Sequence, residues 1–205
     1  MGLLADAVSR LTWSCAFPSS RWSTRKIEVV QQSWKTFQGG SDATTVGVVV
    51  FRRFLKRSPG FLQLFPFRDQ PLETLFLNAK VRLHGKLFMD TLSRTIALLS
   101  DDKALKSSLF DLGSRHADLY RVKTGHYEAM GKALLESLEQ SLGPNGWDEE
   151  TQEAWEETWA HITKLMQAGA GSRDVSHRGD GSVRGRDLSN RGRKSPRKPS
   201  VTRNS

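Results

Sequence analysis

The sequence predicts an all-α protein, and two observations carry that prediction. Apolar residues recur at spacings of three and four over most of residues 25–168, which is the period of an amphipathic helix. No stretch in the same range alternates apolar and polar residues in the way that a half-buried strand does. Short clusters of Gly, Pro and Asp separate the periodic stretches, so the range divides into several helices.

The first two helices are expected at 27–37 and 43–58. Thr24 is suited to cap the first helix, and a Gly-Gly pair follows its last periodic residue. Asp42 is suited to cap the second helix, which Pro59 stops or redirects. The pattern therefore predicts two helices of three to four turns, joined by a short glycine-containing link.

The remaining elements follow from the same signals. The aromatic, proline-containing stretch GFLQLFPFRDQP predicts a short helical turn and a bend. Helices are then expected from Leu72 or Thr74 to Leu99, from Asp101-Asp102 through His116, from His126 to Leu142, and from the acids at 148–150 to about Met166. Gly143-Pro144-Asn145-Gly146 is the plainest turn in the chain.

The net charge of +9 comes from the two ends of the chain. Residues 1–26 hold four Lys or Arg and one Asp, and residues 169–205 hold ten Lys or Arg and three Asp. Residues 27–168 hold 17 Lys or Arg against 18 Asp or Glu. Because the helical part is almost neutral, we expect no specific nucleic-acid partner. The basic end of the chain is suited to contact anionic surfaces.

The composition divides the chain into 1–24, 25–168 and 169–205. Residues 1–24 mix Ser, Arg and apolar residues with one acid, which fits a flexible extension or an organellar targeting segment. Residues 169–205 offer almost nothing to bury, which predicts disorder. The single cysteine, Cys15, cannot form an internal disulfide and favours a reducing, cytoplasmic setting. The sequence contains no run of about 18 apolar residues, the length that a membrane-spanning helix needs.

Two histidines stand on apolar helical faces. His116 falls in register with Leu105, Leu109, Leu112 and Leu119 at helical spacing. A histidine in this position is most often a core residue bonded to a backbone carbonyl. However, His84 also shares a helical face with Phe88. Two inward histidines on separate helices are too few ligands for zinc, whereas haem iron needs only one or two axial ligands and an apolar slot.

These residues resemble a globin over residues 25–168. Trp34 in QQSWKTF, the run FRRFLKRSP, the histidine-glycine pair in LHGK, the segment LGSRHADLYRVKTGHYEAMGKALLESL and the ending WDEETQEAWEETWAHITKLM agree with the family in order and spacing. The resemblance implies seven to eight helices around a pocket for haem b. It makes His116 the proximal iron ligand and His84 the distal residue, which either stabilises a bound ligand or is itself the sixth ligand.

The resemblance also implies which side chains touch the haem. They are Phe65, Phe51, Phe88, Leu112, Val122 and Tyr127. Leu87 takes a place where some members carry a basic residue for a haem propionate, so we expect Arg121 or Lys80 to serve instead. Phe51 and Phe88 are bulkier than the aliphatic residues that are common in oxygen-storage globins.

The function that the resemblance implies is reversible binding of O₂ at ferrous iron, for storage, transport or scavenging, with NO, CO and nitrite as further ligands. A second hypothesis is a redox enzyme, an NO dioxygenase or nitrite reductase, that depends on an external reductase. A third is a sensor in which a ligand displaces His84 from the iron. A fourth is a helical protein without a cofactor.

Overall fold

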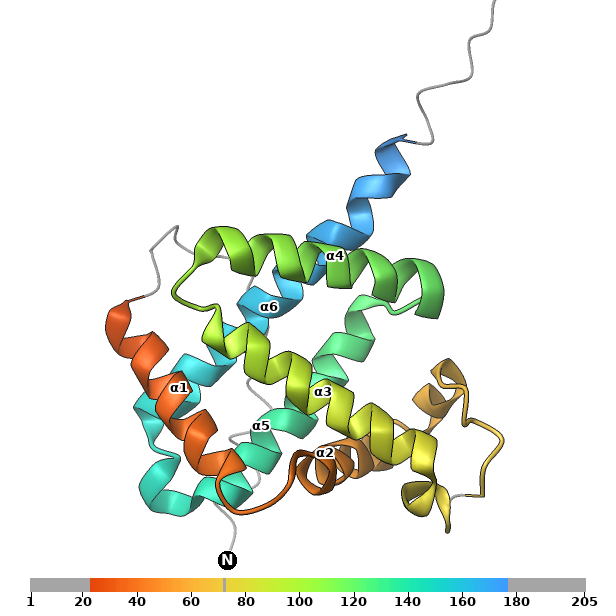
Figure 1. The fold of residues 1–205 in the computed structure, drawn as a ribbon, viewed down its shortest axis with the longest axis horizontal. Coiled ribbons are helices and arrows are strands. Elements are labelled where there is room, and N and C mark those ends of the chain that lie inside the picture. The colour runs from red at the N-terminus through yellow and green to blue at the C-terminus, as the bar shows by residue number, and fades with distance from the viewer. Residues whose placement is uncertain (1–22, 72, 177–205) are drawn as a thin grey trace, which may run out of the picture.

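The computed structural model describes residues 23–71 and 73–176, and in these residues it is all-α, as predicted (Figure 1). The elements are α1 (Thr24–Gln38), α2 (Ala43–Arg57), η2 (Pro59–Leu64), η3 (Leu75–Leu77), α3 (Ala79–Ala97), α4 (Asp102–Tyr120), α5 (Thr124–Gly146) and α6 (Glu149–Ser176). The two η elements are short 3₁₀ helices. The parts of the chain expected to be a flexible extension and a basic tail lie mostly outside the described residues.

Side-chain caps fix several helix starts at the expected places. The Asp42 carboxylate accepts hydrogen bonds from Thr44 N and Thr45 N at 2.9 and 3.1 Å, so it caps α2 as predicted. Asp101 caps α4 by accepting from Ala104 N at 3.0 Å. Each cap satisfies backbone N–H groups that have no partner within the helix.

Two helix starts differ from the prediction. Ser23, rather than Thr24, caps α1, because its hydroxyl accepts from Lys26 N at 3.2 Å. Helix α3 begins at Ala79 rather than near Thr74, because Asn78 leaves the helical conformation and accepts from Lys80 N at 2.9 Å. The residues before Asn78 form only the short η3 turn.

The last two helices also differ from the prediction at their ends. Helix α5 continues past Leu142 but is broken at Gly143, whose φ of 65° and ψ of −178° are not helical. The Gly-Pro pair thus makes the predicted turn inside one nearly continuous element. Helix α6 runs on to Ser176, so residues 169–176, which composition assigned to the tail, are helical and project past α4 in Figure 1.

The core consists of two apolar clusters. The larger one joins all six α-helices and includes the tilted ring pair Trp34 and Trp155, 5.8 Å apart. The smaller one joins α2, the 3₁₀ segments, the start of α3 and α5 around Phe51, Phe54 and Phe67.

Glycines allow the two helices that carry the histidines to pack closely on their neighbours. A Cβ on Gly47 of α2 would lie 2.2 Å from the carbonyl oxygen of Gly85 in α3. A Cβ on Gly113 of α4 would lie 1.9 Å from the carbonyl oxygen of Met166 in α6. Helices approach this closely only where the side chain is a hydrogen atom.

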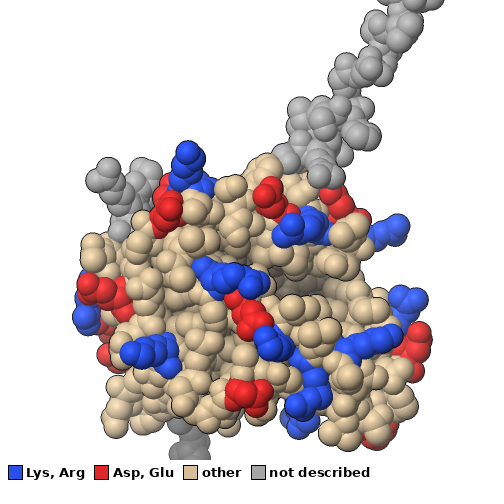
Figure 2. Space-filling model, in the orientation of Figure 1, with Lys and Arg blue, Asp and Glu red and all other residues tan. Residues whose placement is uncertain are grey.

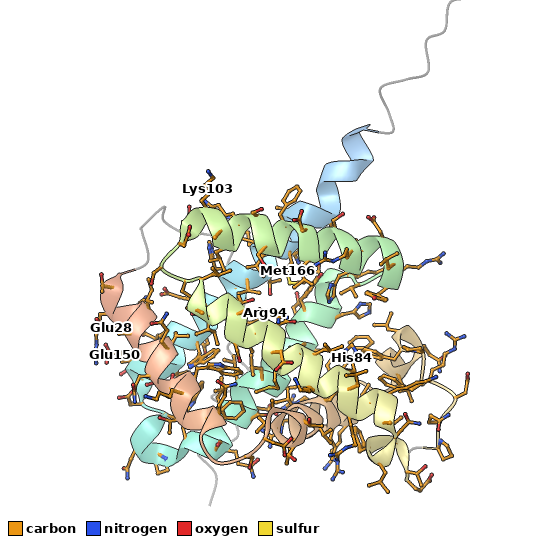
Figure 3. The ribbon with its side chains drawn as sticks, in the orientation of Figure 1. Glu28, His84, Arg94, Lys103, Glu150 and Met166 are labelled. Atoms are coloured by element: carbon orange, nitrogen blue, oxygen red, sulfur yellow. The ribbon has the colours of Figure 1, made fainter. Side chains whose placement is uncertain are left out.

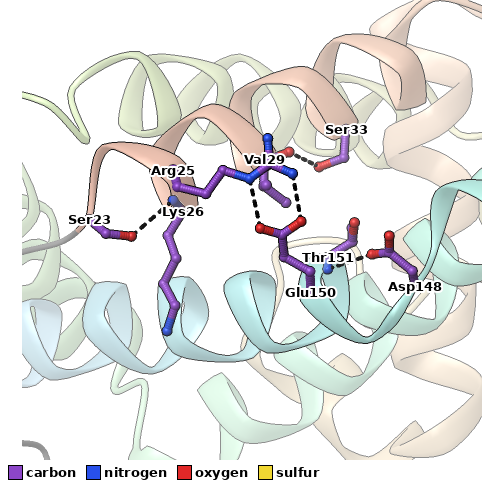
Figure 4. Close-up of polar contacts among 8 residues, drawn as sticks. All are labelled: Ser23, Arg25, Lys26, Val29, Ser33, Asp148, Glu150 and Thr151. Carbon is purple, nitrogen blue, oxygen red and sulfur yellow. Dashed lines mark hydrogen bonds and ion pairs between the residues drawn. The ribbon is translucent and has the colours of Figure 1, made fainter.

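Polar contacts on the surface join the start of α1 to α6. The Arg25 guanidinium donates to both carboxylate oxygens of Glu150 at 2.7 and 2.6 Å, and Thr151 N donates to Asp148 at 2.8 Å (Figure 4). Both partners of the ion pair are exposed, so it orients α1 more than it stabilises the fold. None of the described helices has the length and apolar character needed to cross a bilayer.

Candidate functional site

A cavity of about 430 Å³ lies between α3 and α4, and Figure 2 shows its opening as a hollow on the face of the molecule. Side chains from α2 to α6 and from the bend after η2 line it. They are Phe51, Phe54, Leu64, Phe65, Pro66, His84, Leu87, Phe88, Thr91, Leu92, Thr95, Leu109, Leu112, Arg115, His116, Tyr120, Val122, His126, Tyr127, Met130, Trp159, Ile162 and Met166. Most of these side chains are apolar, and the volume is in the range of small-molecule sites.

The eight residues that the sequence suggested as iron ligands or as haem-touching side chains all line this one cavity. The two histidines, His84 and His116, come from α3 and α4. The six proposed haem contacts come from separate places in the chain: Phe51, Phe65 and Phe88, then Leu112, Val122 and Tyr127. The cavity therefore brings together side chains that lie up to 76 residues apart in the sequence, from 51 to 127.

The ring of His116 is oriented by its own helix. Its Nδ1 lies 2.9 Å from the carbonyl oxygen of Leu112, one turn earlier, and donates to it in the tautomer that carries a proton there. This is the carbonyl bond expected of a histidine on an apolar helical face. Burial lowers the pKa of His116, the bond to Leu112 opposes that shift, and the positive charge of Arg115 adds to it. The ring is therefore neutral at pH 7, with Nε2 free to act as a ligand.

His84 lies in a cage of aromatic rings. Its ring centre is 4.9 Å from that of Phe51, 5.1 Å from Phe65 and 6.2 Å from Phe67, all in edge-to-face geometry. No hydrogen bond joins its ring nitrogens to another described residue. Burial, with a smaller contribution from the charge of His116, lowers the pKa of His84 to about 4. A neutral imidazole with no hydrogen-bond partner among the described residues thus borders the cavity.

Tyr127 adds a buried hydroxyl to the wall beside His116. The side chain is 7% exposed, its ring centre lies 6.5 Å from that of His116, and its hydroxyl has no hydrogen-bond partner among the described residues. Burial raises the pKa of Tyr127 to about 12, so the hydroxyl keeps its proton. A buried polar atom without a partner is costly, and this one borders the space that a ligand would fill.

The comparisons with known proteins agree with this geometry. The Globin family model matches residues 48–166, which is more than half of the chain. The chain belongs to the globin family. Among curated relatives, polymeric globin component P2 of Glycera dibranchiata is 23% identical over 145 residues, covering 70% of this chain and 94% of its own length. A protein of Gossypium hirsutum that is named an anaerobic nitrite reductase is 28% identical, covering 71% of this chain and 92% of its own length.

Solved structures share the fold. The hexa-coordinate haemoglobin of Drosophila melanogaster, studied for cyanide binding and haem-cavity transitions, superposes with a TM-score of 0.65 at 22% identity. The superposition covers 71% of this globin and 94% of that chain. Membership of the family makes this globin a haem-binding protein.

The residues present fit a haem. An apolar slot with a neutral histidine on each of two helices provides one or two axial ligands, which is all that haem iron requires. Among the described residues, no three His, Cys, Asp or Glu side chains converge in the way that a protein-only metal site needs. Helix α4 also places Arg115 at the cavity, where its cation suits an acidic edge of the ligand.

Arg115 lines the cavity, and the two basic residues expected to meet a haem propionate, Arg121 and Lys80, do not. Arg121 instead ends α4 in a left-handed conformation, with φ of 53° and its N–H bonded back to Ala117 and His116. Arg115 directly precedes His116 on α4, and both side chains line the cavity.

The far wall of the cavity was not predicted from the sequence. Trp159, Ile162 and Met166 of α6 line it, and their spacing of three and four already assigned them to one inward face. His126 lines it as well, with its Nδ1 accepting from Lys123 N at 2.9 Å. An inward face alone does not distinguish a core residue from a residue that borders a cavity, so this signal was insufficient.

Proposed function

We propose that this globin binds haem b through His116 and reversibly binds O₂ on the side of His84. The observation that carries the proposal is the neutral, unpartnered imidazole of His84 bordering the same apolar cavity as His116. The haem, when bound, supplies an iron atom that accepts one imidazole nitrogen and leaves another position for a small ligand. NO and CO are further ligands of the same kind.

His116 is suited to hold the iron because its other nitrogen is already engaged. The bond from Nδ1 to the Leu112 carbonyl fixes the tautomer and the ring plane, as partners of metal-bound histidines commonly do. Leu112 and Val122 border the cavity beside it and restrict the ring. Phe51, Phe65 and Phe88 make the opposite wall apolar, which excludes water from the ligand.

His84 is suited to stabilise a bound ligand that carries partial negative charge. A hydrogen bond from its N–H to such a ligand is worth about 1.5–3 kcal/mol, a factor of roughly 10 to 150 in affinity. We therefore expect His84→Leu to release O₂ faster by a factor in that range. His161→Leu is the matched control, because this half-buried histidine of α6 does not line the cavity. Equal O₂ dissociation rates in wild type and His84→Leu would refute the role.

The first experiment is the visible absorption spectrum of the haem-reconstituted protein after anaerobic reduction. A single broad visible band indicates five-coordinate iron and an open ligand position, which supports O₂ binding. His116→Gly should lose this spectrum and regain it with millimolar imidazole, because the free base replaces the missing ligand. A spectrum equal to that of free haem would refute the proposal.

A second function is favoured by the same unpartnered His84. If its nitrogen binds the iron, the protein is six-coordinate, and ligands must displace it. One relative is named a nitrite reductase and one similar structure is a hexa-coordinate haemoglobin. Two sharp visible bands in the reduced protein would favour this redox or sensor function. Turnover with nitrite or NO would then require electrons from an external reductase.

A further inference from the structure

The charges of residues 27–168 nearly cancel, but they are unevenly distributed along the chain. Residues 43–86, from α2 to the first half of α3, hold eight Lys or Arg and two acids, a net charge of +6. The rest of residues 27–168 holds nine Lys or Arg and sixteen acids, a net charge of −7. The two acids of the basic part, Asp69 and Glu73, lie in the link between η2 and η3, so α2 and the start of α3 contain none.

The outer face of α2 carries part of this positive charge. Val49, Arg52 and Lys56 follow one another at spacings of three and four, so they share a face of the helix. All three side chains are exposed, including the apolar Val49. Lys56 forms no ion pair with a described residue, whereas the two remaining cations of α2 donate to side chains of α5. The face is therefore basic, and α2 has no acid of its own to neutralise it.

Arg52 connects this face of α2 to the short helix η3. Its guanidinium carbon lies 4.8 Å from the centre of the Phe76 ring, which is a cation–π contact. The next residue, Leu77, is 76% exposed, more than any other large apolar side chain of the described residues. Lys80 follows in the first turn of α3, is exposed, and has no ion pair with a described residue. In Figure 2, several Lys and Arg side chains lie at the lower right, where α3 begins in Figure 1. We name these residues the α2–η3 surface: Val49, Arg52, Lys56, Leu77 and Lys80.

We propose that the α2–η3 surface binds the surface of an anionic phospholipid bilayer. Lys and Arg side chains are attracted to a layer of anionic headgroups, and each cation near that layer adds to the binding. An exposed apolar side chain such as Leu77 inserts at the boundary between headgroups and acyl chains. The inference goes beyond the proposed function, because the α2–η3 surface contributes no residue to the lining of the cavity.

Charge and chemistry favour a bilayer over three other occupants. A symmetric dimer would bring the same cations of two copies together, and like charges destabilise such a contact. The centre of a protein interface is usually poor in charged residues, whereas here Arg52 lies between the apolar Val49 and Leu77. Single-stranded nucleic acid stacks its bases on exposed aromatic rings, whereas Phe76 is partly buried and lies beneath Arg52.

The acids that a bilayer would repel lie on another side of the molecule. In Figure 3, Glu28 of α1 and Glu150 of α6 are labelled at the left, whereas α3 begins at the lower right. The two ends of the chain, residues 1–26 and 169–205, carry net charges of +3 and +7 and would strengthen the attraction. The α2–η3 surface therefore determines which side of the folded part faces the bilayer.

The test is co-sedimentation of the full-length, haem-loaded protein with phosphatidylcholine vesicles that contain about one third phosphatidylserine. Lys56→Glu should weaken binding at least about fivefold at low salt, because each cation near an anionic surface contributes a factor of this size. The difference should shrink at about 500 mM salt, which screens exposed charges. Leu77→Ser should weaken binding several-fold at both salt concentrations, because salt does not screen the insertion of an apolar side chain.

Lys164→Glu is the matched control, because it makes the same charge change at an exposed position of α6, which packs mainly on α1, α4 and α5. Both variants keep the basic ends of the chain, so a difference between them depends on position alone. Lys164→Glu should bind the vesicles like the wild type, and both variants should keep the wild-type circular dichroism spectrum.

Equal vesicle binding by Lys56→Glu and Lys164→Glu would overturn the proposal, since the basic ends would then account for the attraction. Absence of binding to the phosphatidylserine vesicles, or equal binding to pure phosphatidylcholine, would also overturn it. So would dimerisation or binding of poly(U) RNA that Lys56→Glu weakens in a protein that does not bind the vesicles. A missing haem band counts against the proposed function, whereas a normal band without position-dependent vesicle binding counts against the α2–η3 surface alone.

Discussion

The packing of α4 on α6 can be tested at Gly113. A Cβ there would lie 1.9 Å from the carbonyl oxygen of Met166 and 2.5 Å from its carbonyl carbon and Cα. Since ordinary contacts of a Cβ begin near 3.4 Å, Gly113→Ala must move the two backbones apart by about 1.5 Å. Gly169, one turn further along α6, makes a second close approach, to the backbone of Phe110 in α4. Because the two helices are in close contact at both points, a tilt of α6 cannot make room for the new methyl group at Gly113.

The expected loss of stability follows from two opposing effects. Overpacking between backbones costs about 1–3 kcal/mol, and the backbone contacts here favour the upper value. Alanine has a higher helix propensity than glycine by about 1 kcal/mol, which offsets part of this cost. We therefore expect Gly113→Ala to lower the free energy of unfolding by about 2 kcal/mol. For a chain of this size the Tm should fall by about 4–8 °C.

The assay is urea unfolding of the purified protein, followed by circular dichroism. Gly125→Ala is the control, because a Cβ at this glycine of α5 meets nothing within 4 Å. It should leave stability unchanged or raise it by up to about 1 kcal/mol. Because α4 carries His116, Gly113→Ala should also weaken haem retention, while Gly125→Ala should not. Equal or greater stability of Gly113→Ala than wild type would refute the close approach of the two helices.

Three further predictions concern single side chains. Ser33→Ala should cost about 1–3 kcal/mol in urea unfolding, because the buried Trp155 indole N–H loses its acceptor at 2.9 Å, whereas Thr36→Ala on the exposed side of α1 should change little. The free energy of unfolding of the apoprotein should fall by about 2 kcal/mol from pH 7.5 to 5.0. In the unfolded chain His84 takes up a proton below its usual pKa of 6.5, whereas in the folded protein it does so only near a pKa of about 4. That stability is complete above pH 6.5, and urea unfolding of His84→Leu should lack this part of the slope. Arg115→Glu should speed haem transfer to an acceptor apomyoglobin, and an unchanged transfer rate would contradict its role beside the cavity.

The sequence predicted helices well where a cap and a periodic face agree. Asp42 and Asp101 precede inward apolar residues, and both cap helices in the structure. It failed at α3, where Leu75 and Leu77 extend the apolar pattern backwards although Asn78 interrupts the helix. Leu75 is fully buried in a 3₁₀ turn, and periodicity does not distinguish such a turn from another turn of α-helix.

The residues that the sequence suggested for a site line one cavity, but the electrostatics of that cavity could not be predicted from the sequence. Helical spacing assigns His84 and His116 to inward faces, and the family resemblance pairs them across a cofactor. Neither signal reveals that the phenylalanine cage holds the pKa of His84 at about 4, because Phe51, Phe65 and Phe67 come together only through the bend after η2. The unpartnered Tyr127 hydroxyl likewise depends on packing between α5 and its neighbours.

The hydrogen bond from His116 to Leu112 does not by itself distinguish a core histidine from an iron ligand, since both assignments predict it. The environment of His84 distinguishes a core histidine from an iron ligand more clearly. A core histidine would be expected to bond a carbonyl, whereas His84 has aromatic edges around it and no hydrogen-bonding partner among the described residues. The same cage makes its neutral nitrogen available either to the iron or to a ligand on the iron. Binding of His84 to the iron and binding of O₂ therefore compete for one coordination position. Phe51→Leu would widen the aromatic cage around His84 and should shift that competition. The ratio of the five-coordinate to the six-coordinate visible bands measures the shift.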